Sequence, residues 1–287
     1  MKPSAIKELI DGSDELFSLP DIYFQLNEMI RDARFSLADI GKVIAKDPAL
    51  SARLLRIVNS PFYGFQAKID TISRAIAVIG IADLTNLIIA TTVVDRFGKI
   101  PGELIDMTSF WMRSIQTAVI ARLLAKHSAV LHTERLFLAG LLHDLGSLVL
   151  SQKMPELYHR VLLAADHDRR LQAGFEQELI GFTHAEVGRE LLKSWGLPES
   201  LYETIGCYLD PSEAQVHKLD SHILHMAALL AGSGVHADGV QGTVESFSEQ
   251  SLILVRLDRA QIVAIMASVD DEFSQIFELL GPNKRFH

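Results

Sequence analysis

TERLFLAGLLHDLGSLVLSQ, residues 133–152, is the most informative stretch of this sequence. Thr133 is a candidate helix cap, and Glu134 places a negative charge in the first turn, where exposed N–H groups favour it. Over residues 136–150 apolar side chains fall on every side of a helical wheel, a pattern typical of a buried helix. We therefore predict one buried helix at the centre of the core.

A histidine and an aspartate, His143 and Asp144, stand next to each other in the middle of this apolar run. A buried carboxylate needs a partner, because an unpaired one is costly or takes up a proton. Two interpretations follow. Either the pair binds a metal ion, or both side chains are hydrogen-bonded within the core.

The composition restricts the class of protein. With 287 residues, of which 48% are hydrophobic, the chain can form one large domain or two ordinary ones. A formal charge of −9 argues against binding to nucleic acid, which depends on clustered Lys and Arg. The single cysteine, Cys207, favours a reducing compartment. Apolar runs such as residues 84–94 are shorter than the roughly 20 residues that span a bilayer. We expect a cytoplasmic protein without a membrane segment.

Helical periodicity runs through the whole chain, and signals for strands and hairpins are nearly absent. Ser36, Asp47 and Thr71 are predicted N-caps, and Pro48 suits the first position of a helix. Gly80 is predicted to end the helix that Thr71 begins. The expected fold class is all-α.

The breaker-rich segment at residues 98–102, GKIPG, is the best internal boundary. We expect an N-terminal helical lobe over residues 1–98 and a second helical lobe over residues 103–231. Residues 232–257 begin with many Gly and small polar residues, which favours a mobile loop. Residues 258–287 are predicted to form C-terminal helices packed on the second lobe.

Three segments of the first lobe resemble, in order, the HDOD domain family. They are LFSLPDIYFQLNEMI with its LP start, DPALSARLLRIVNSPFYGF with its DPxLxxxLLxxxN pattern, and the helix of ISRAIAVIGIADL. The likeness continues through Phe110-Trp111, the His-Asp stretch and HAEVGRELLKSWGLPE at residues 184–199, so it covers about residues 16–231. The resemblance implies a two-lobe HDOD fold whose C-terminal lobe is an HD-like helical bundle.

The resemblance also implies two competing functions. HDOD domains are similar to HD-type metal-dependent phosphohydrolases, among them cyclic-di-GMP phosphodiesterases. The HDOD family is nevertheless regarded as regulatory in bacterial signal transduction, often with incomplete metal ligands.

Two of the ligand positions that the resemblance implies hold residues that cannot bind a metal. Arg113 stands where an early histidine is expected, and a guanidinium has no lone pair to offer. Ala227-Ala228 stands where a late aspartate is expected. The vestigial ligand positions that remain are His143, Asp144 and His184. We expect Arg113 to pair with Asp144, to replace the charge of the ion, and to complete a buried polar network with His143.

The loop NSPFYGF, residues 59–65, is a candidate interaction loop. Its residues of interest are Asn59, Ser60, Pro61, Phe62, Tyr63 and Phe65. One hypothesis is an exposed aromatic patch for a partner, and the other is a plug that ties the first lobe to the second. Outward-facing basic residues near this loop are an alternative site for a nucleotide phosphate; they are Arg53, Arg56, Lys68 and Arg74.

Taken together, these patterns favour a non-catalytic regulatory module of bacterial signal transduction. It would bind a signalling protein of unknown identity or a nucleotide, with no cofactor, no nucleic acid and no membrane. The alternative hypothesis is a metal-dependent phosphohydrolase, similar to a cyclic-dinucleotide phosphodiesterase, with an altered ligand set and a divalent ion. A third hypothesis is a ligand sensor that binds a small molecule without turnover.

Overall fold

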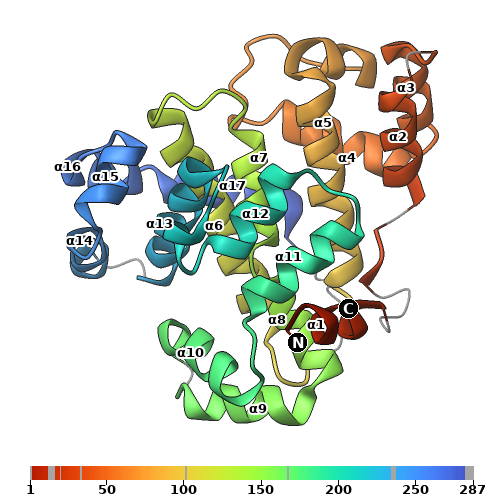
Figure 1. Cartoon of the computed structure of the whole chain (residues 1–287). Coiled ribbons are helices and arrows are strands. Elements are labelled where there is room, and N and C mark those ends of the chain that lie inside the picture. Colours follow the sequence, from red (N-terminus) through yellow and green to blue (C-terminus); the bar gives the residue numbers. More distant parts are fainter. Residues whose placement is uncertain are drawn as a thin grey trace, which may run out of the picture.

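The chain folds into helices joined by short turns (Figure 1). The computed structural model describes residues 2–11, 17–19, 21–32, 34–100, 102–166, 168–233 and 237–281. Within these ranges the backbone forms α-helices and short 3-10 turns, and no strand. The all-α class expected from the periodicity is therefore confirmed.

The N-terminal lobe lies at the upper right of Figure 1. Its helices are α2 (Asp21–Arg31), α3 (Leu37–Ile44), α4 (Pro48–Val58) and α5 (Ile72–Phe97). The three predicted caps are confirmed, because the side chains of Ser36, Asp47 and Thr71 each accept the backbone N–H three residues later. Each cap satisfies a donor that the helix itself leaves unpaired, so these helix starts are set locally.

The first helix, α1 (Lys2–Asp11), packs against α11 (His184–Ser194) and not within the N-terminal lobe. Phe17 contacts both lobes: its carbonyl oxygen accepts the Trp195 indole N–H at 2.8 Å, and its ring lies 5.7 Å from that of Phe97 in α5. The N-terminal lobe expected over residues 1–98 therefore excludes α1. The reason is that a short amphipathic helix joins whichever apolar surface it reaches, and local sequence does not specify that surface.

α5 is interrupted at Gly80, where φ is 84° and ψ is 162°. Glycine alone adopts this combination readily, so the predicted helix end at Gly80 is confirmed. By length and composition α5 could cross a membrane. Its unbroken part, residues 81–97, spans only about 26 Å, less than the roughly 30 Å of a bilayer core. Leu84, Ile88 and Val93 are buried inside the protein, as in a core helix.

The second lobe is built around α6 (Met107–His127), which is buried along most of its length. α6 contacts α7 (Glu134–Leu142), α13 (Lys218–Gly232) and α17 (Val269–Leu280). Gly140 permits α7 to approach α6 backbone to backbone, since a Cβ there would lie 2.5 Å from the Ala118 Cα. The remaining helices between α7 and α13 are α8 (Leu145–Lys153), α9 (Pro155–Ala164), α10 (Arg169–Leu179), α11 and α12 (Glu199–Cys207).

The prediction of one continuous helix over residues 133–152 is wrong. The helix ends at Leu142, and α8 starts at Leu145, so His143 and Asp144 form the junction between two helices. Thr133 also makes no side-chain cap. Both halves of the stretch are buried, so apolar periodicity could not locate the break. α8 is redirected onto α11, and a Cβ on Gly146 would overlap the His184 carbonyl oxygen.

The mobile loop expected over residues 232–257 is also wrong, because this segment contains α14 (Ala237–Glu245) and α15 (Glu249–Val255). Residues 234–236 lie outside the described ranges. Buried Val244 and Phe247 supply the apolar contacts of this region, and α14 packs against α13 and α16 (Arg259–Met266). Tertiary packing here outweighs the low helix propensity of glycine.

The C-terminal helices, α16 (Arg259–Met266) and α17, contact α6, and α17 also contacts α4 and α5 of the N-terminal lobe. Arg53 of α4 makes this second contact: its Nε donates to the Leu279 carbonyl oxygen at 3.1 Å. Arg53 also pairs with Asp95 at 2.5 Å and is buried, so the prediction that it faces outward is wrong. The Leu279 partner of Arg53 lies 226 residues away, so no local sequence pattern indicates that Arg53 is buried. Residues 282–287 lie outside the described ranges.

Candidate functional site

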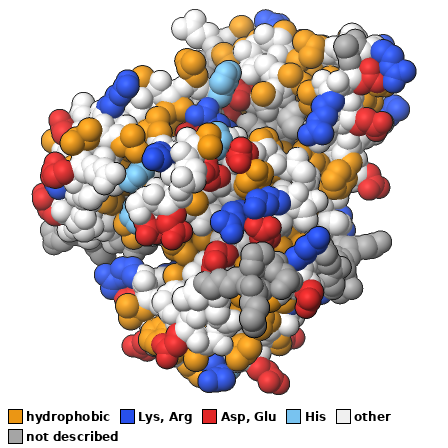
Figure 2. All heavy atoms as spheres, viewed as in Figure 1, with side chains coloured by type: hydrophobic (Ala, Val, Ile, Leu, Met, Phe, Trp, Pro, Cys, Tyr) orange, Lys and Arg blue, Asp and Glu red, His pale blue; other side chains and the backbone are white. Residues whose placement is uncertain are grey.

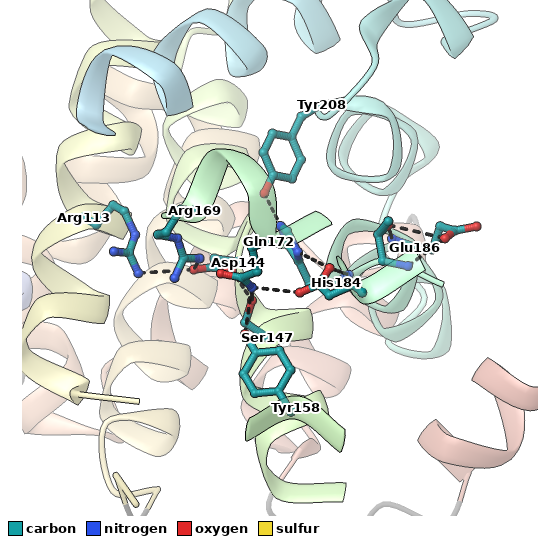
Figure 3. Close-up of polar contacts among 11 residues, drawn as sticks. Arg113, Asp144, Ser147, Tyr158, Arg169, Gln172, His184, Glu186 and Tyr208 are labelled. Atoms are coloured by element: carbon teal, nitrogen blue, oxygen red, sulfur yellow. Dashed lines mark hydrogen bonds and ion pairs between the residues drawn. The ribbon is translucent and has the colours of Figure 1, made fainter. Parts of the chain in front are cut away.

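A buried polar cluster surrounds the junction between α7 and α8 (Figure 3). It draws side chains from five other helices or their ends as well as from α8. Its members are Arg113 of α6, Asp144 and Ser147, Tyr158 of α9, Arg169, Gln172 and Glu176 of α10, His184 of α11 and Tyr208 at the end of α12. Within a predominantly apolar lobe, this cluster is the natural candidate site.

Asp144 is fully buried, and both of its carboxylate oxygens are engaged. Oδ1 accepts a hydrogen bond from the Ser147 hydroxyl. Oδ2 accepts one from Nη2 of Arg169 and lies 3.5 Å from Nη2 of Arg113. Burial alone would raise the pKa of Asp144, but the positive charges of Arg169, His184 and Arg113 hold it well below its usual range. The carboxylate is therefore ionised and shared between two guanidinium groups.

Arg169 is the functional residue that the sequence reasoning missed. The structure places Arg113 beside Asp144, as the sequence suggested, but the closer contact belongs to Arg169. Arg169 is the first residue of α10, and the Asp168 carboxylate caps that helix. In the sequence Arg169 is one of two adjacent arginines in a polar stretch, so no local signal marks it as the partner of a buried carboxylate.

His143 lies next to Asp144 but turns to a different partner. Its Nδ1 donates to the Gly140 carbonyl oxygen at 2.7 Å, a partner that can only accept. Burial lowers the pKa of His143 to about 4, although the neighbouring Asp144 opposes that shift. His143 is thus a neutral imidazole at neutral pH, and its ring packs edge-on against Tyr208 at a centroid distance of 5.2 Å.

His184 belongs to a second charged pair in the cluster. Its Nδ1 lies 2.6 Å from Oε2 of Glu176, its backbone N–H donates to the same oxygen at 2.8 Å, and its Nε2 lies 2.5 Å from the Tyr208 hydroxyl. Burial would lower the pKa of His184, but the charge and hydrogen bond of Glu176 together with the charge of Asp144 raise it. Gln172 completes the pair by donating to the other oxygen of Glu176 at 2.8 Å. Both ring nitrogens of His184 are therefore occupied.

These contacts test whether the cluster could hold a divalent ion. Both oxygens of Asp144 and both nitrogens of His184 already have protein partners. Ala227 is buried and offers no donor atom. No group of three or more His, Cys, Asp or Glu side chains in the described ranges is arranged to hold a metal ion. The donor atoms of Asp144 and His184 are committed to ion pairs and hydrogen bonds, so they do not fit a metal centre.

The candidate interaction loop, residues 59–65, divides into a buried and an exposed part. Phe62 is buried and contacts Phe137 of α7 at a centroid distance of 5.3 Å. The Arg122 guanidinium lies 3.6 Å above the Phe62 ring and donates to its carbonyl oxygen at 2.9 Å. Arg122 is itself paired with Glu134 at 2.9 Å. Phe62 therefore joins the N-terminal lobe to α6 and α7.

The rest of the loop is closed by Asn59 and reaches the surface at Phe65. The Asn59 amide group bonds to both the N–H and the carbonyl oxygen of Ile69, at 2.7 and 2.6 Å. Ser60 is buried and donates to the backbone, whereas Pro61 and Phe65 are exposed. Tyr63 is half-buried and stacks on Phe65.

Of the four basic residues near this loop, Arg53 is buried in its contacts with α17 and Asp95, whereas Arg56, Lys68 and Arg74 are exposed. The prediction of a common outward-facing group is therefore wrong for Arg53. On the face drawn in Figure 2, acidic and basic side chains are interspersed.

Comparisons with known proteins agree with the fold. A family model described as the HDOD domain matches residues 16–211. A relative from Treponema pallidum (strain Nichols), itself uncharacterised, is 28% identical over 201 residues. The match covers 69% of this chain but only 38% of the relative, so the chain spans well under half of that protein's length.

Three solved structures are similar over most of the chain. An HDOD domain protein of unknown function from Geobacter sulfurreducens has a TM-score of 0.77 and 24% identity, covering 96% of this chain and 97% of its own. A candidate phosphohydrolase from Shewanella amazonensis SB2B has a TM-score of 0.74 and 27% identity. The match covers 96% of this chain and 98% of that protein. A candidate signal transduction protein from Marinobacter aquaeolei VT8 has a TM-score of 0.68 and 20% identity. The match covers 92% of this chain and 58% of that protein.

Proposed function

Because the chain belongs to the HDOD domain family, we propose that it is a non-catalytic regulatory module of bacterial signal transduction. The observation that carries this proposal is the state of Asp144. Its carboxylate bridges two arginines and a serine inside the protein. A hydrolytic metal centre needs free ligand atoms and an open position for water, and this carboxylate provides neither.

The internal ion pairs would also resist entry of a metal. An ion could bind Asp144 only after Arg169 had moved away, which would break a buried salt bridge at a cost of about 3–5 kcal/mol. The alternative function, a phosphohydrolase with an altered ligand set, requires that rearrangement. We therefore favour a cytoplasmic module that acts through binding and needs no cofactor.

The candidate interaction loop supports a protein partner in preference to a nucleotide or a nucleic acid. Phe62 fixes the loop to the second lobe, so exposed Pro61 and Phe65 are held on a rigid base. Rigid exposed aromatic side chains are typical anchors of protein interfaces. In this proposal a signalling protein contacts Phe65, and the buried polar cluster keeps the second lobe in one arrangement.

Metal loading tests the non-catalytic part of the proposal. The full chain is stripped with a chelator, reloaded with Mn²⁺, Fe²⁺ or Zn²⁺, and analysed for metal content beside His143→Ala. The same samples are assayed on bis(p-nitrophenyl) phosphate and on cyclic di-GMP. We expect little retained metal and no turnover in either protein. One equivalent of metal that supports turnover and is lost in His143→Ala would contradict the proposal.

Site-specific crosslinking tests the interaction surface. A photoreactive amino acid replaces Phe65 in one sample and Leu163 of α9, which is 60% exposed, in the control. We expect position 65 alone to capture a specific protein in the cells that encode this chain. The purified partner should then bind Phe65→Ala about tenfold more weakly than wild type, as for an anchor residue. Equal binding to both proteins would contradict the assignment of the loop.

A further inference from the structure

A cavity of about 170 Å³ lies beside the buried polar cluster, between the N-terminal end of α6, α9 and the start of α10. Its polar floor is formed by Arg113, Tyr158, Arg169 and Gln172. Its apolar wall includes Phe110 and Leu162. The cavity is separate from the candidate interaction loop, which packs against the α7 side of the second lobe.

The floor of the cavity carries more positive than negative charge. Two guanidinium groups, those of Arg113 and Arg169, lie on the same side of Asp144 and share its Oδ2 (Figure 3). The next carboxylate of the cluster, Glu176, is paired with His184. The single negative charge of Asp144 therefore pairs with both Arg113 and Arg169.

Arg113 has an unused hydrogen-bond donor at this place. Its Nε is buried and has no hydrogen-bond partner among the residues that the structure describes. A buried N–H without a partner is unfavourable, so an acceptor that reached Arg113 Nε would stabilise it. Burial and the nearby charge of Arg169 also lower the pKa of Arg113, as expected for a guanidinium that lacks a full counter-charge.

Two further carboxylates line the cavity, and both have structural roles. Asp168 pairs with Arg170 and caps α10 through the Arg170 N–H. Asp106 caps α6 by accepting the Ser109 N–H at 2.7 Å. Both carboxylates lie at helix N-termini, where the helix dipole stabilises a negative charge. The charges that act most strongly on the pKa of Arg113 are those of Arg169, which lowers it, and Asp144, which raises it.

We propose that this cavity binds a small organic anion, with a carboxylate or phosphoryl group on Arg113 and Arg169 and a short apolar tail against Phe110 and Leu162. The cavity is smaller than the roughly 300–1,000 Å³ of sites for drug-sized ligands. It corresponds to about six water volumes, so it holds an acid of a few heavy atoms and not a whole nucleotide. This anion site does not depend on the candidate interaction loop. Through it, a small anion could regulate the module.

Calorimetric titration with matched ligands tests the assignment. Carboxylates from propionate to hexanoate form one series, and inorganic phosphate with short alkyl phosphates forms the other. Butyramide, which has the shape of butyrate without its charge, is the matched neutral ligand. We expect saturable one-to-one binding of at least one anion with a dissociation constant of about 1 mM or tighter, and none of butyramide.

Two variants and a control locate the bound anion. Arg113→Gln removes one guanidinium but leaves the Arg169–Asp144 pair, and Leu162→Trp fills the cavity without changing its charge. Arg56→Gln removes an exposed positive charge from α4, a helix that contributes no residue to the cavity, and serves as the control. We expect about a tenfold or greater loss of affinity in the first two variants, as for a charge-assisted contact, and none in the control.

The assignment is overturned if no anion in either series binds the folded wild-type protein saturably. It is also overturned if affinity is unchanged in Arg113→Gln and Leu162→Trp. If circular dichroism finds one of these variants unfolded, the other decides. Recovered ligand is analysed by chromatography, because hydrolysis of a bound phosphate ester would contradict the non-catalytic function while leaving the binding site in place.

Discussion

Asp144 shows how a single carboxylate can be kept ionised in an apolar core. The charge is costly to bury, but two guanidinium groups and one hydroxyl surround it. The two arginines are not equivalent. Arg169 forms a direct hydrogen bond to Oδ2 of Asp144. Nη2 of Arg113 lies 3.5 Å from the same oxygen, and Arg113 also lines the cavity.

Removal of Arg169 should therefore destabilise the protein more than removal of Arg113. We expect Arg169→Met to lower the free energy of unfolding by about 3 kcal/mol or more, because Asp144 would lose its main partner. Arg113→Met should cost about 1 kcal/mol, typical of one weaker charged contact. Urea denaturation of both variants measures the difference. Equal losses would mean that the two arginines share the carboxylate evenly.

The neutral state of His143 predicts a pH dependence of stability. Its pKa is about 4 in the folded protein, against about 6.5 in an unfolded chain, so the unfolded state takes up its proton first as pH falls. The stabilising contribution is complete above pH 6.5 and is lost progressively as pH falls toward 4. His184 has a raised pKa, so it acts in a different range: its contribution is lost as pH rises above 6.5.

His143→Asn isolates the first effect, because the Asn side chain keeps an N–H for the Gly140 carbonyl oxygen but does not titrate. We compare the free energy of unfolding of wild type with that of the variant. The difference between them should become smaller as pH is lowered from 6.5 to 4. Urea denaturation across this range measures the difference. A constant difference would show that folding does not shift the pKa of His143.

At the scale of the helices, a glycine brings α6 and α7 into close backbone contact. The contact at Gly140 and Ala118 leaves no room for a side chain. This approach brings the α7–α8 junction, with His143 and Asp144, within reach of Arg113 on α6. The packing of two helices thus places the buried polar cluster.

Gly140→Ala should lower the free energy of unfolding by about 1–3 kcal/mol, because the added methyl group would overlap backbone atoms that cannot move independently. Gly174→Ala, in α10, is the matched control. A Cβ there meets no atom within 4 Å, so this change should stabilise the protein by about 0.5–1 kcal/mol. Thermal denaturation compares both with wild type, and a stable Gly140→Ala variant would refute the close approach.

In the whole molecule, the two lobes are joined at widely separated points. Phe62 and Arg122 connect the N-terminal lobe to α6 and α7, and Arg53 connects it to α17. The ring of Phe97, at the end of α5, contacts Trp195 at a centroid distance of 5.8 Å. Contacts at both ends of the N-terminal lobe should hold the exposed part of the interaction loop in one position.

Phe62→Ala should cost about 3 kcal/mol of unfolding free energy, because a fully packed ring is lost from the contact between the lobes. Phe65→Ala, three residues away and exposed, should change stability by less than about 0.5 kcal/mol. Hydrogen exchange should show faster opening of α4 and α5 in Phe62→Ala alone. Similar behaviour of the two variants would mean that the loop does not connect the lobes.

The features that could be predicted from the sequence are those that depend on neighbouring residues. The caps at Ser36, Asp47 and Thr71 and the break at Gly80 involve contacts or angles within a few positions of each residue. The all-α class and the family followed from periodic patterns and ordered motifs, which are also written along the chain. At the candidate site, the motif alone indicated that Arg113 lies near Asp144.

The tertiary structure decided everything that depends on distant residues meeting. It brought Arg169 onto Asp144, turned Arg53 inward to α17, and placed α1 on the second lobe. It also bent the chain at His143 and Asp144, where both flanking helices are equally buried and periodicity is uniform. The physical reason is the same in each case: an ionic or apolar contact gains its energy from proximity in space, and separation along the chain does not specify that proximity.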